Sequence, residues 1–209
     1  PLPNQIVDLE GTKDGKLWVS SFLQIGFFDT TTGVFQSVRK NPNAAPHEFL
    51  SSLFQEGPDG SMWVGQPGQL LRIRGKSVEV FHLPELSVFP LTDIAFDLAG
   101  NMFVSTRKQI FKLSAAHTIA PETARFELFY RFPKEGIIGS TKLVMDRGGL
   151  LWIGTNGYGI LKYNPGNHRF YHYLAGKSPR RIVADTQQRV WVWQAGGMFR
   201  RLLEKENQL

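Results

Sequence analysis

The sequence predicts an all-β protein, a β-propeller of about five four-stranded antiparallel blades. Three observations predict this fold: a short motif recurs five times, its spacing fits the length of a blade, and the strand that carries it is apolar at consecutive positions. The motif is a turn followed by an aromatic core residue, at Trp18, Trp63, Phe103, Trp152 and Trp191. The intervals are 45, 40, 49 and 39 residues, and a four-stranded blade takes roughly 40–50 residues.

Each repeat can be read as four short strands. An apolar strand, such as residues 142–146, leads into a tight turn with Asp-Gly or Gly-Gly, which suits a hairpin that needs positive φ. The aromatic core strand follows, then a third strand such as residues 159–163 and an outer strand such as residues 34–38. Leu151, Trp152 and Ile153 are apolar in succession, which indicates a strand covered on both faces, as in stacked blades.

The repeats define one β-propeller region over residues 1–209. Their expected spans are about 4–45, 46–89, 90–138, 139–177 and 178–209. The fifth repeat has three strands and too few residues after them for an outer strand. The sequence also begins at Pro1, not Met. We therefore favour an incomplete part of a larger propeller, processed or excised from a longer protein, over a closed five-bladed ring.

Other folds and several kinds of site fit the sequence less well. An immunoglobulin-like sandwich would not repeat one Trp position five times, and no segment sustains a helical period. The absence of Cys excludes disulfides and thiolate metal sites. No apolar run approaches the ~18 residues of a transmembrane helix, so membrane attachment is expected only through segments outside this chain.

The fourth repeat carries a resemblance to a known family. Residues 146–160, Asp-Arg-Gly-Gly-Leu-Leu-Trp-Ile-Gly-Thr-Asn-Gly-Tyr-Gly-Ile, resemble the two-component regulator propeller repeat. The resemblance covers nearly the whole chain, although the third copy has Phe103 for Trp and the fifth lacks the turn glycine. It implies a sensor propeller of a hybrid histidine kinase or related signalling protein, in the periplasm or another extracytoplasmic space.

The second repeat carries another resemblance. Residues 56–63, with Leu83 and Pro84 closing the blade, are similar to the streptogramin lyase propeller, an enzyme family that uses a catalytic His and a metal. The shared residues are turn and core positions, so the resemblance implies the fold. A streptogramin-lyase-like enzyme is kept as the alternative function.

The charge of the chain is uneven. The net charge is +6, and residues 141–209 hold 11 Lys and Arg against 4 Asp and Glu. A basic patch can attract nucleic acid or anionic lipid. We favour a solvated face or a contact surface for the rest of the protein, and we expect no nucleic-acid partner.

The titratable residues indicate no catalytic site, no metal site and no cofactor. His168 and His172 would lie roughly 13 Å apart on one strand, too far for one metal ion. Asp97, Asp146 and Asp185 each stand six residues before the core aromatic. We expect these carboxylates to accept backbone N–H groups in the turns.

Ligand recognition is therefore expected in loops at one end of the blades. The turns between second and third strands and the loops between blades combine amides, aromatics and Arg, a mixture that suits small polar ligands. The candidate ligand-binding residues are Gln24, Gln66, Arg107, Asn156, Tyr158, Trp193 and Gln194. We expect a non-catalytic sensor or interaction module that recognises a small polar ligand, such as an oligosaccharide, or other domains of its receptor. A homodimer is left open.

Overall fold

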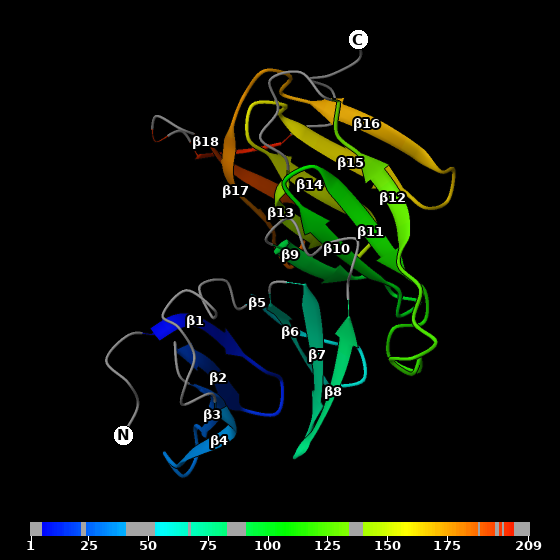
Figure 1. The fold of residues 1–209 in the computed structure, drawn as a ribbon. Helices are drawn as coiled ribbons and strands as arrows, with labels where there is room; N and C mark the ends of the chain where they lie inside the picture. Colours follow the sequence, from blue (N-terminus) through cyan, green and yellow to red (C-terminus); the bar gives the residue numbers. More distant parts are fainter. Residues whose placement is uncertain are drawn as a thin grey trace. The chain divides into compact units, whose positions relative to one another are not determined.

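The computed structural model describes residues 6–21, 24–40, 53–66, 68–82, 91–133, 140–187, 189–194, 197 and 199–202. In these residues nineteen strands form five antiparallel sheets (Figure 1). The part of the chain so described contains no helix long and apolar enough to cross a membrane. The chain divides into two compact units, Pro1–Leu91 with His117–Ala124, and Thr92–Ala116 with Arg125–Leu209. Each unit is described by itself.

The first unit contains two four-stranded sheets, which we call blades one and two. Strands are hydrogen-bonded in sequence order, as predicted for propeller blades. Blade one consists of β1 (Ile6–Gly11), β2 (Lys16–Ser21), β3 (Gln24–Asp29) and β4 (Phe35–Lys40). Blade two consists of β5 (Leu53–Glu56), β6 (Met62–Gln66), β7 (Gln69–Arg74) and β8 (Ser77–His82).

The second unit contains blades three to five. Blade three consists of β9 (Leu91–Phe96), β10 (Met102–Thr106), β11 (Gln109–Leu113) and β12 (Glu127–Arg131). Blade four consists of β13 (Ser140–Met145), β14 (Leu151–Thr155), β15 (Ile160–Asn164) and β16 (Arg169–Tyr173). Blade five is a three-stranded sheet of β17 (Pro179–Ala184), β18 (Val190–Gln194) and β19 (Phe199–Arg201). The sequence predicts three strands for this blade, and the described residues show three, whereas residues 203–209 lie outside the described part of the chain.

Consecutive blades within a unit share an apolar core, which confirms the expectation that the core strands are covered on both faces. Trp18 of blade one packs against Phe54 of blade two, with ring centroids 6.2 Å apart. Trp152 of blade four lies in one cluster with Val190 and Val192 of blade five. Trp191 occupies the same repeat position in blade five and is only half-buried.

The Asp residues six positions before the core aromatic stabilise turns, as predicted. The Asp146 carboxylate accepts hydrogen bonds from the backbone N–H groups of Gly148 and Leu150, both at 2.9 Å. Its second oxygen accepts the indole N–H of Trp152 at 2.8 Å. Asp185 does the same in blade five, where Trp191 Nε1 donates to it at 2.9 Å. In blades four and five the carboxylate therefore links the turn to the aromatic residue of its own blade.

These contacts predict a pH dependence of stability. The hydrogen bond from Trp191, assisted by those from Arg189, holds the pKa of Asp185 far below its ordinary value. A carboxyl group with a lowered folded-state pKa stabilises the fold above its unfolded pKa of about 3.9, and the contribution is lost as the pH falls below that value. We expect Asp185→Asn to be less stable than the unsubstituted protein at about pH 7, and we expect this deficit to become smaller as the pH is lowered to about 2. Urea unfolding at both pH values measures this, and a deficit that is the same at both would contradict it.

A second set of Asp residues joins neighbouring inner strands. Asp8 in β1 accepts the backbone N–H of Phe54 in β5 at 3.3 Å, and Asp93 in β9 accepts that of Leu143 in β13 at 2.6 Å. Both Asp residues stand ten positions before the core aromatic. Burial raises the pKa of Asp93, although Lys142 Nζ lies 3.1 Å from its carboxylate. The repeat therefore encodes contacts between blades as well as within them.

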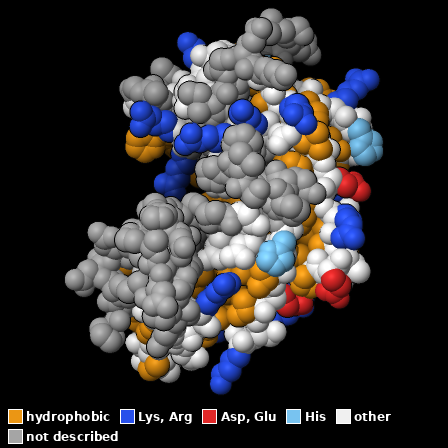
Figure 2. All heavy atoms as spheres, viewed as in Figure 1, with side chains coloured by type: hydrophobic (Ala, Val, Ile, Leu, Met, Phe, Trp, Pro, Cys, Tyr) orange, Lys and Arg blue, Asp and Glu red, His pale blue; other side chains and the backbone are white. Residues whose placement is uncertain are grey.

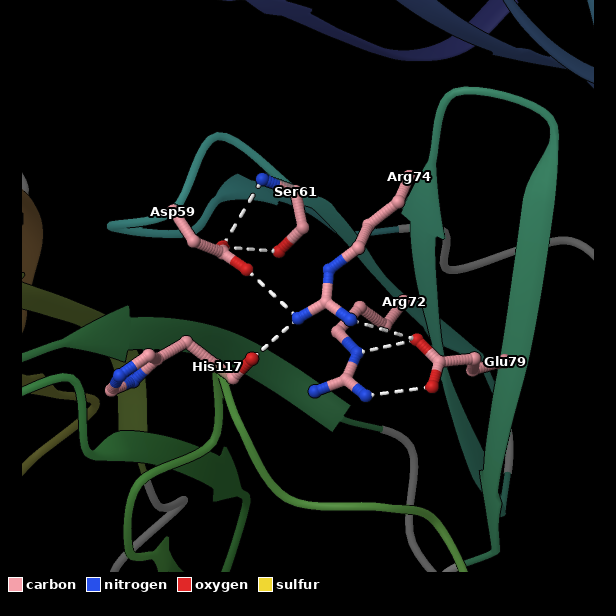
Figure 3. A network of polar contacts seen from close by, with 6 residues as sticks. All are labelled: Asp59, Ser61, Arg72, Arg74, Glu79 and His117. Carbon is pink, nitrogen blue, oxygen red and sulfur yellow. Dashed lines mark hydrogen bonds and ion pairs between the residues drawn. The ribbon is translucent and has the colours of Figure 1, made fainter.

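A polar network supports blade two (Figure 3). Arg72, 2% exposed, lies beside the rings of Trp63 and Phe81, with its guanidinium carbon 5.4 and 5.0 Å from their centroids. It donates two hydrogen bonds to Glu79, both at 2.7 Å. Arg74 pairs with Glu79 at 3.4 Å and with Asp59 at 2.9 Å. The cations at this edge of β7 are thus neutralised within the blade.

Candidate functional site

Two of the predicted ligand-binding residues lie in the first unit. Gln24 begins β3 and is half-buried, and its backbone N–H and carbonyl both bond to the Ser21 hydroxyl at 3.2 Å. Gln66 ends β6 and is 3% exposed. Its Oε1 accepts a hydrogen bond from Gln69 Nε2 at 2.8 Å, while its own Nε2 has no hydrogen-bond partner among the described residues.

Three more lie in turns of the second unit. Arg107 is exposed between β10 and β11, and Asn156 is half-buried between β14 and β15. Tyr158, in the same turn as Asn156, packs its ring 4.3 Å from that of His172. Burial and a side-chain hydrogen bond with Tyr158 raise the pKa of Tyr130 to about 12. Tyr158 is therefore held by neighbouring aromatic residues, whereas Arg107 extends into solvent.

The last two, Trp193 and Gln194, end β18 and lie on opposite faces of blade five. Trp193 is 48% exposed, whereas Gln194 is 9% exposed. The Nε2 atom of Gln194 has no hydrogen-bond partner in the described part of the chain. The two residues are neighbours in sequence, but alternation along the strand assigns them to different surroundings.

Trp193 departs from the repeat. It stands two positions after the core aromatic, where the other four repeats have Ser20, Gly65, Ser105 and Gly154. Those four small residues are all buried. A large ring at this position therefore distinguishes blade five from the other four blades. It lies on the face of the sheet that carries the core aromatic, the face that packs against the next blade in blades one and four.

Trp193 belongs to a surface of aromatic and basic side chains. Arg181 on β17 and Phe199 on β19 are its direct cross-strand partners, and partners in register project to the same face. Both are exposed, Phe199 to 58%. The neighbouring row places Trp191 between Val183 and Arg201. We call these six residues the blade-five surface. Figure 2 shows Lys and Arg side chains beside apolar ones in the region of β17 and β18.

The next repeat position also varies. Ser21, Thr106 and Thr155 close their turns, each hydroxyl bonding to the backbone across the turn, as from Thr155 Oγ1 to the Gly159 carbonyl at 2.7 Å. Gln66 and Gln194 replace them in blades two and five. Sequence reasoning missed Arg181 and Phe199 as site residues and did not compare these two positions across repeats. An alignment of the five repeats on the core aromatic would have shown both departures.

Two of the described histidines, His168 and His172, contact tyrosines. His168 lies in the turn before β16 rather than on the strand, and its Nδ1 bonds to the Tyr163 hydroxyl at 2.9 Å. His172 is half-buried, and its Nε2 contacts the Tyr158 carbonyl. Among the residues that the structure describes, no group of three His, Cys, Asp or Glu side chains could hold a metal ion. His47 lies outside the described residues.

Comparison with known proteins defines the class of fold. No protein-family model and no curated protein matches this chain. Among solved structures, virginiamycin B lyase from Staphylococcus aureus is similar with a TM-score of 0.72 and 16% identity, over 99% of this chain and 73% of that one. A streptogramin B lyase structure also gives a TM-score of 0.72, at 15% identity, over 94% of this chain and 68% of that one.

The extracellular domain of a signalling system gives a comparable TM-score. The extracellular domain of BT4673 from B. thetaiotaomicron, assigned as a one-component system, matches with a TM-score of 0.69 and 15% identity. The match covers 95% of this chain but only 27% of that domain. At these identities the likeness establishes the fold, a β-propeller. A second structure of the BT4673 extracellular domain, assigned to a hybrid two-component system, gives a TM-score of 0.70 at 16% identity. The resemblance to propellers of two-component systems is therefore confirmed for the fold.

Proposed function

We propose that this chain is a non-catalytic ligand-binding propeller module of an extracytoplasmic signal-transduction receptor. The observation that carries the proposal is Trp193, a Trp 48% exposed at a position where the other four repeats have buried Ser or Gly. Because the other repeats have a small residue here, the Trp193 ring is an addition to the repeat, and recognition of a ligand or partner is the role that we assign to it.

The chemistry of the blade-five surface favours a polar ligand with flat faces. Trp193 and Phe199 offer apolar rings, and Arg181 in the same row offers planar N–H donors. Trp191 and Phe199 stack with centroids 5.3 Å apart and an angle of 7° between their planes. Sugar rings combine apolar faces with hydroxyl acceptors, so an oligosaccharide is the ligand class that we favour.

A thermal-shift screen tests this proposal. We expect one of cellohexaose, xylohexaose and mannohexaose at millimolar concentration to raise the Tm by a few degrees, because a ligand that binds only the folded state stabilises it. Trp193→Ala should weaken binding about tenfold or more, as expected when a central aromatic anchor is removed. Leu98→Ala is the matched control, because Leu98 is an apolar side chain of the same unit that is 79% exposed. Equal loss in both variants, or no shift with any of the three sugars, would overturn the proposed ligand class.

The same surface also suits another domain of the receptor. Val183 and Phe199 are 39% and 58% exposed, and apolar side chains in contiguous rows are typical of protein contacts. A receptor-domain partner would be expected to protect β17–β19 from hydrogen exchange in the longer receptor compared with this chain alone. Unchanged exchange there would exclude this alternative.

The lyase alternative rests on the resemblance of residues 56–63 and on the structural likeness. The comparison set includes an inactive virginiamycin B lyase with quinupristin, at a TM-score of 0.71 and 16% identity. Incubation of this chain with quinupristin and analysis by mass spectrometry tests the alternative. We expect the antibiotic to be recovered unchanged. The histidines that could serve as the catalytic His of such an enzyme are His47 and His82, so ring opening that is lost in His47→Ala or His82→Ala would support the enzyme instead.

A further inference from the structure

A cavity of about 470 Å³ lies between blades one and two of the first unit. It opens at the edge that carries the β1–β2, β5–β6 and β7–β8 turns. Because strands in each blade are antiparallel, this edge is opposite to the β2–β3 and β6–β7 turns, where the predicted Gln24 and Gln66 lie. The volume falls in the range of small-molecule sites, roughly 300–1,000 Å³. This site is separate from the blade-five surface, which belongs to the other unit.

The floor of the cavity is apolar. Trp18 and Phe27, 6% and 8% exposed, contribute their rings, and Val38 and Ile73 contribute aliphatic side chains. All four belong to the core cluster between the two blades or pack against it. A ligand body that covers this floor gains from apolar burial, whereas a fully hydroxylated body would leave polar groups without partners.

Among the residues that the structure describes, the rim carries one positive charge without an ion-pair partner. Lys16 forms an ion pair with Asp14, and the hydrogen bond from Lys16 lowers the pKa of that carboxyl group. Thr12 also donates to Asp14, at 2.5 Å. Lys76, in the turn between β7 and β8, is exposed and has no ion pair within the described residues. The rim therefore offers one free ammonium group to a ligand.

Glycine turns keep the mouth of the cavity open. Gly60 and Gly75 line it with φ of +76° and +59°, and a Cβ atom at either residue would meet nothing within 4 Å. The positive φ favours glycine at both turns, so no side chain of these residues fills the entrance.

We infer that this cavity binds a small monocarboxylate with an apolar body, such as an arylacetate. The carboxylate pairs with Lys76 at the rim, and the ring rests on Trp18, Phe27 and Val38, beside the Lys16 ammonium group, which lies 5.3 Å from the Phe27 ring centroid. The site requires a ligand that has both a carboxylate and an apolar body. The charge of Lys76 alone would attract any anion, and the apolar floor alone would accept any apolar group.

Isothermal titration with phenylacetate tests the inference, with phenylacetamide as the uncharged analogue and glucuronate as the charged, hydroxylated one. We expect phenylacetate to bind at least tenfold more tightly than either. Lys76→Met should weaken phenylacetate binding about tenfold. Lys13→Met is the matched control, because Lys13 is exposed nearby but does not line the cavity. Gln36 also lines the cavity and is the cross-strand partner of Phe27, so its side chain projects to the same face. Gln36→Phe should therefore fill the cavity and abolish binding without a loss of secondary structure in circular dichroism.

Three outcomes would overturn the inference: equal binding of phenylacetate and phenylacetamide, tighter binding of glucuronate, or no heat from phenylacetate at millimolar concentration. Equal effects of Lys76→Met and Lys13→Met would also count against it. Trp193→Ala is expected to leave phenylacetate binding unchanged. Failure of phenylacetate binding can therefore be distinguished from failure of the oligosaccharide proposal.

Discussion

Replacing Asp146 by Ala is expected to lower the free energy of unfolding by about 3 kcal/mol, because three N–H donors lose one acceptor. Asp146 is 6% exposed, and its partners are the backbone N–H groups of Gly148 and Leu150 and the indole N–H of Trp152. The indole nitrogen is buried with its residue and water cannot readily replace the carboxylate there. For a chain of this length the expected fall in Tm is about 6–12 °C.

Two further variants distinguish the contribution of the indole hydrogen bond to stability from that of the hydrogen bonds within the turn. The third repeat has Phe103 in place of Trp, so its Asp97 accepts only Ala99 N, Asn101 N and Asn101 Nδ2. Asp97→Ala should therefore cost less, about 1–2 kcal/mol. Trp152→Phe combined with Asp146→Ala should cost less than the sum of the two single changes, because the double variant leaves no buried indole N–H unpaired. Thermal and urea unfolding measure all four variants, and strict additivity would contradict the proposed link between turn and core.

Replacing Glu79 by Ala is the second change with a large expected effect. It leaves the Arg72 guanidinium, 2% exposed, without its two 2.7 Å acceptor contacts. Loss of one partner of a buried ion pair costs about 3–5 kcal/mol, and the lower end is expected here because the Glu79 side chain is 30% exposed.

Apolar replacement of both partners is the matched comparison. Arg72→Met with Glu79→Leu removes both charges and keeps side-chain volume between Trp63 and Phe81, so it should be more stable than Glu79→Ala alone. Urea unfolding followed by tryptophan fluorescence measures the difference. A Glu79→Ala variant within about 1 kcal/mol of the unsubstituted protein would show that Arg72 does not depend on this carboxylate.

Much of the fold follows from the spacing of a few residue types. The aromatic every 39–49 residues, the Asp six positions before it and the run of apolar residues around it each have a direct counterpart in the structure. These features are predictable because they recur at corresponding positions of the repeats and have the same role in the packing of the blades. The inner-strand Asp8 and Asp93 also repeat, but their partners Phe54 and Leu143 belong to the next blade and cannot be read from one repeat.

The candidate sites were less accessible to sequence reasoning. Trp193 was found as a Trp off the repeat position, yet its partners Arg181 and Phe199 depend on strand register. The cavity in the first unit joins Lys76 to Trp18 and Phe27 across two blades, at the edge opposite to the loops that the sequence favoured. No local pattern marks such a cavity, because each of its residues also has an ordinary place in a turn or a core strand.

The central claim is that blade five binds a polar ligand without transforming it. Isothermal titration of the protein with cellohexaose, xylohexaose and mannohexaose, followed by mass spectrometry of the recovered sugar, tests it most directly. The account predicts saturable binding of one sugar, its recovery intact, and a tenfold or greater loss of affinity in Trp193→Ala but not in Leu98→Ala. Cleavage of the bound sugar, or binding that survives Trp193→Ala unchanged, would contradict it.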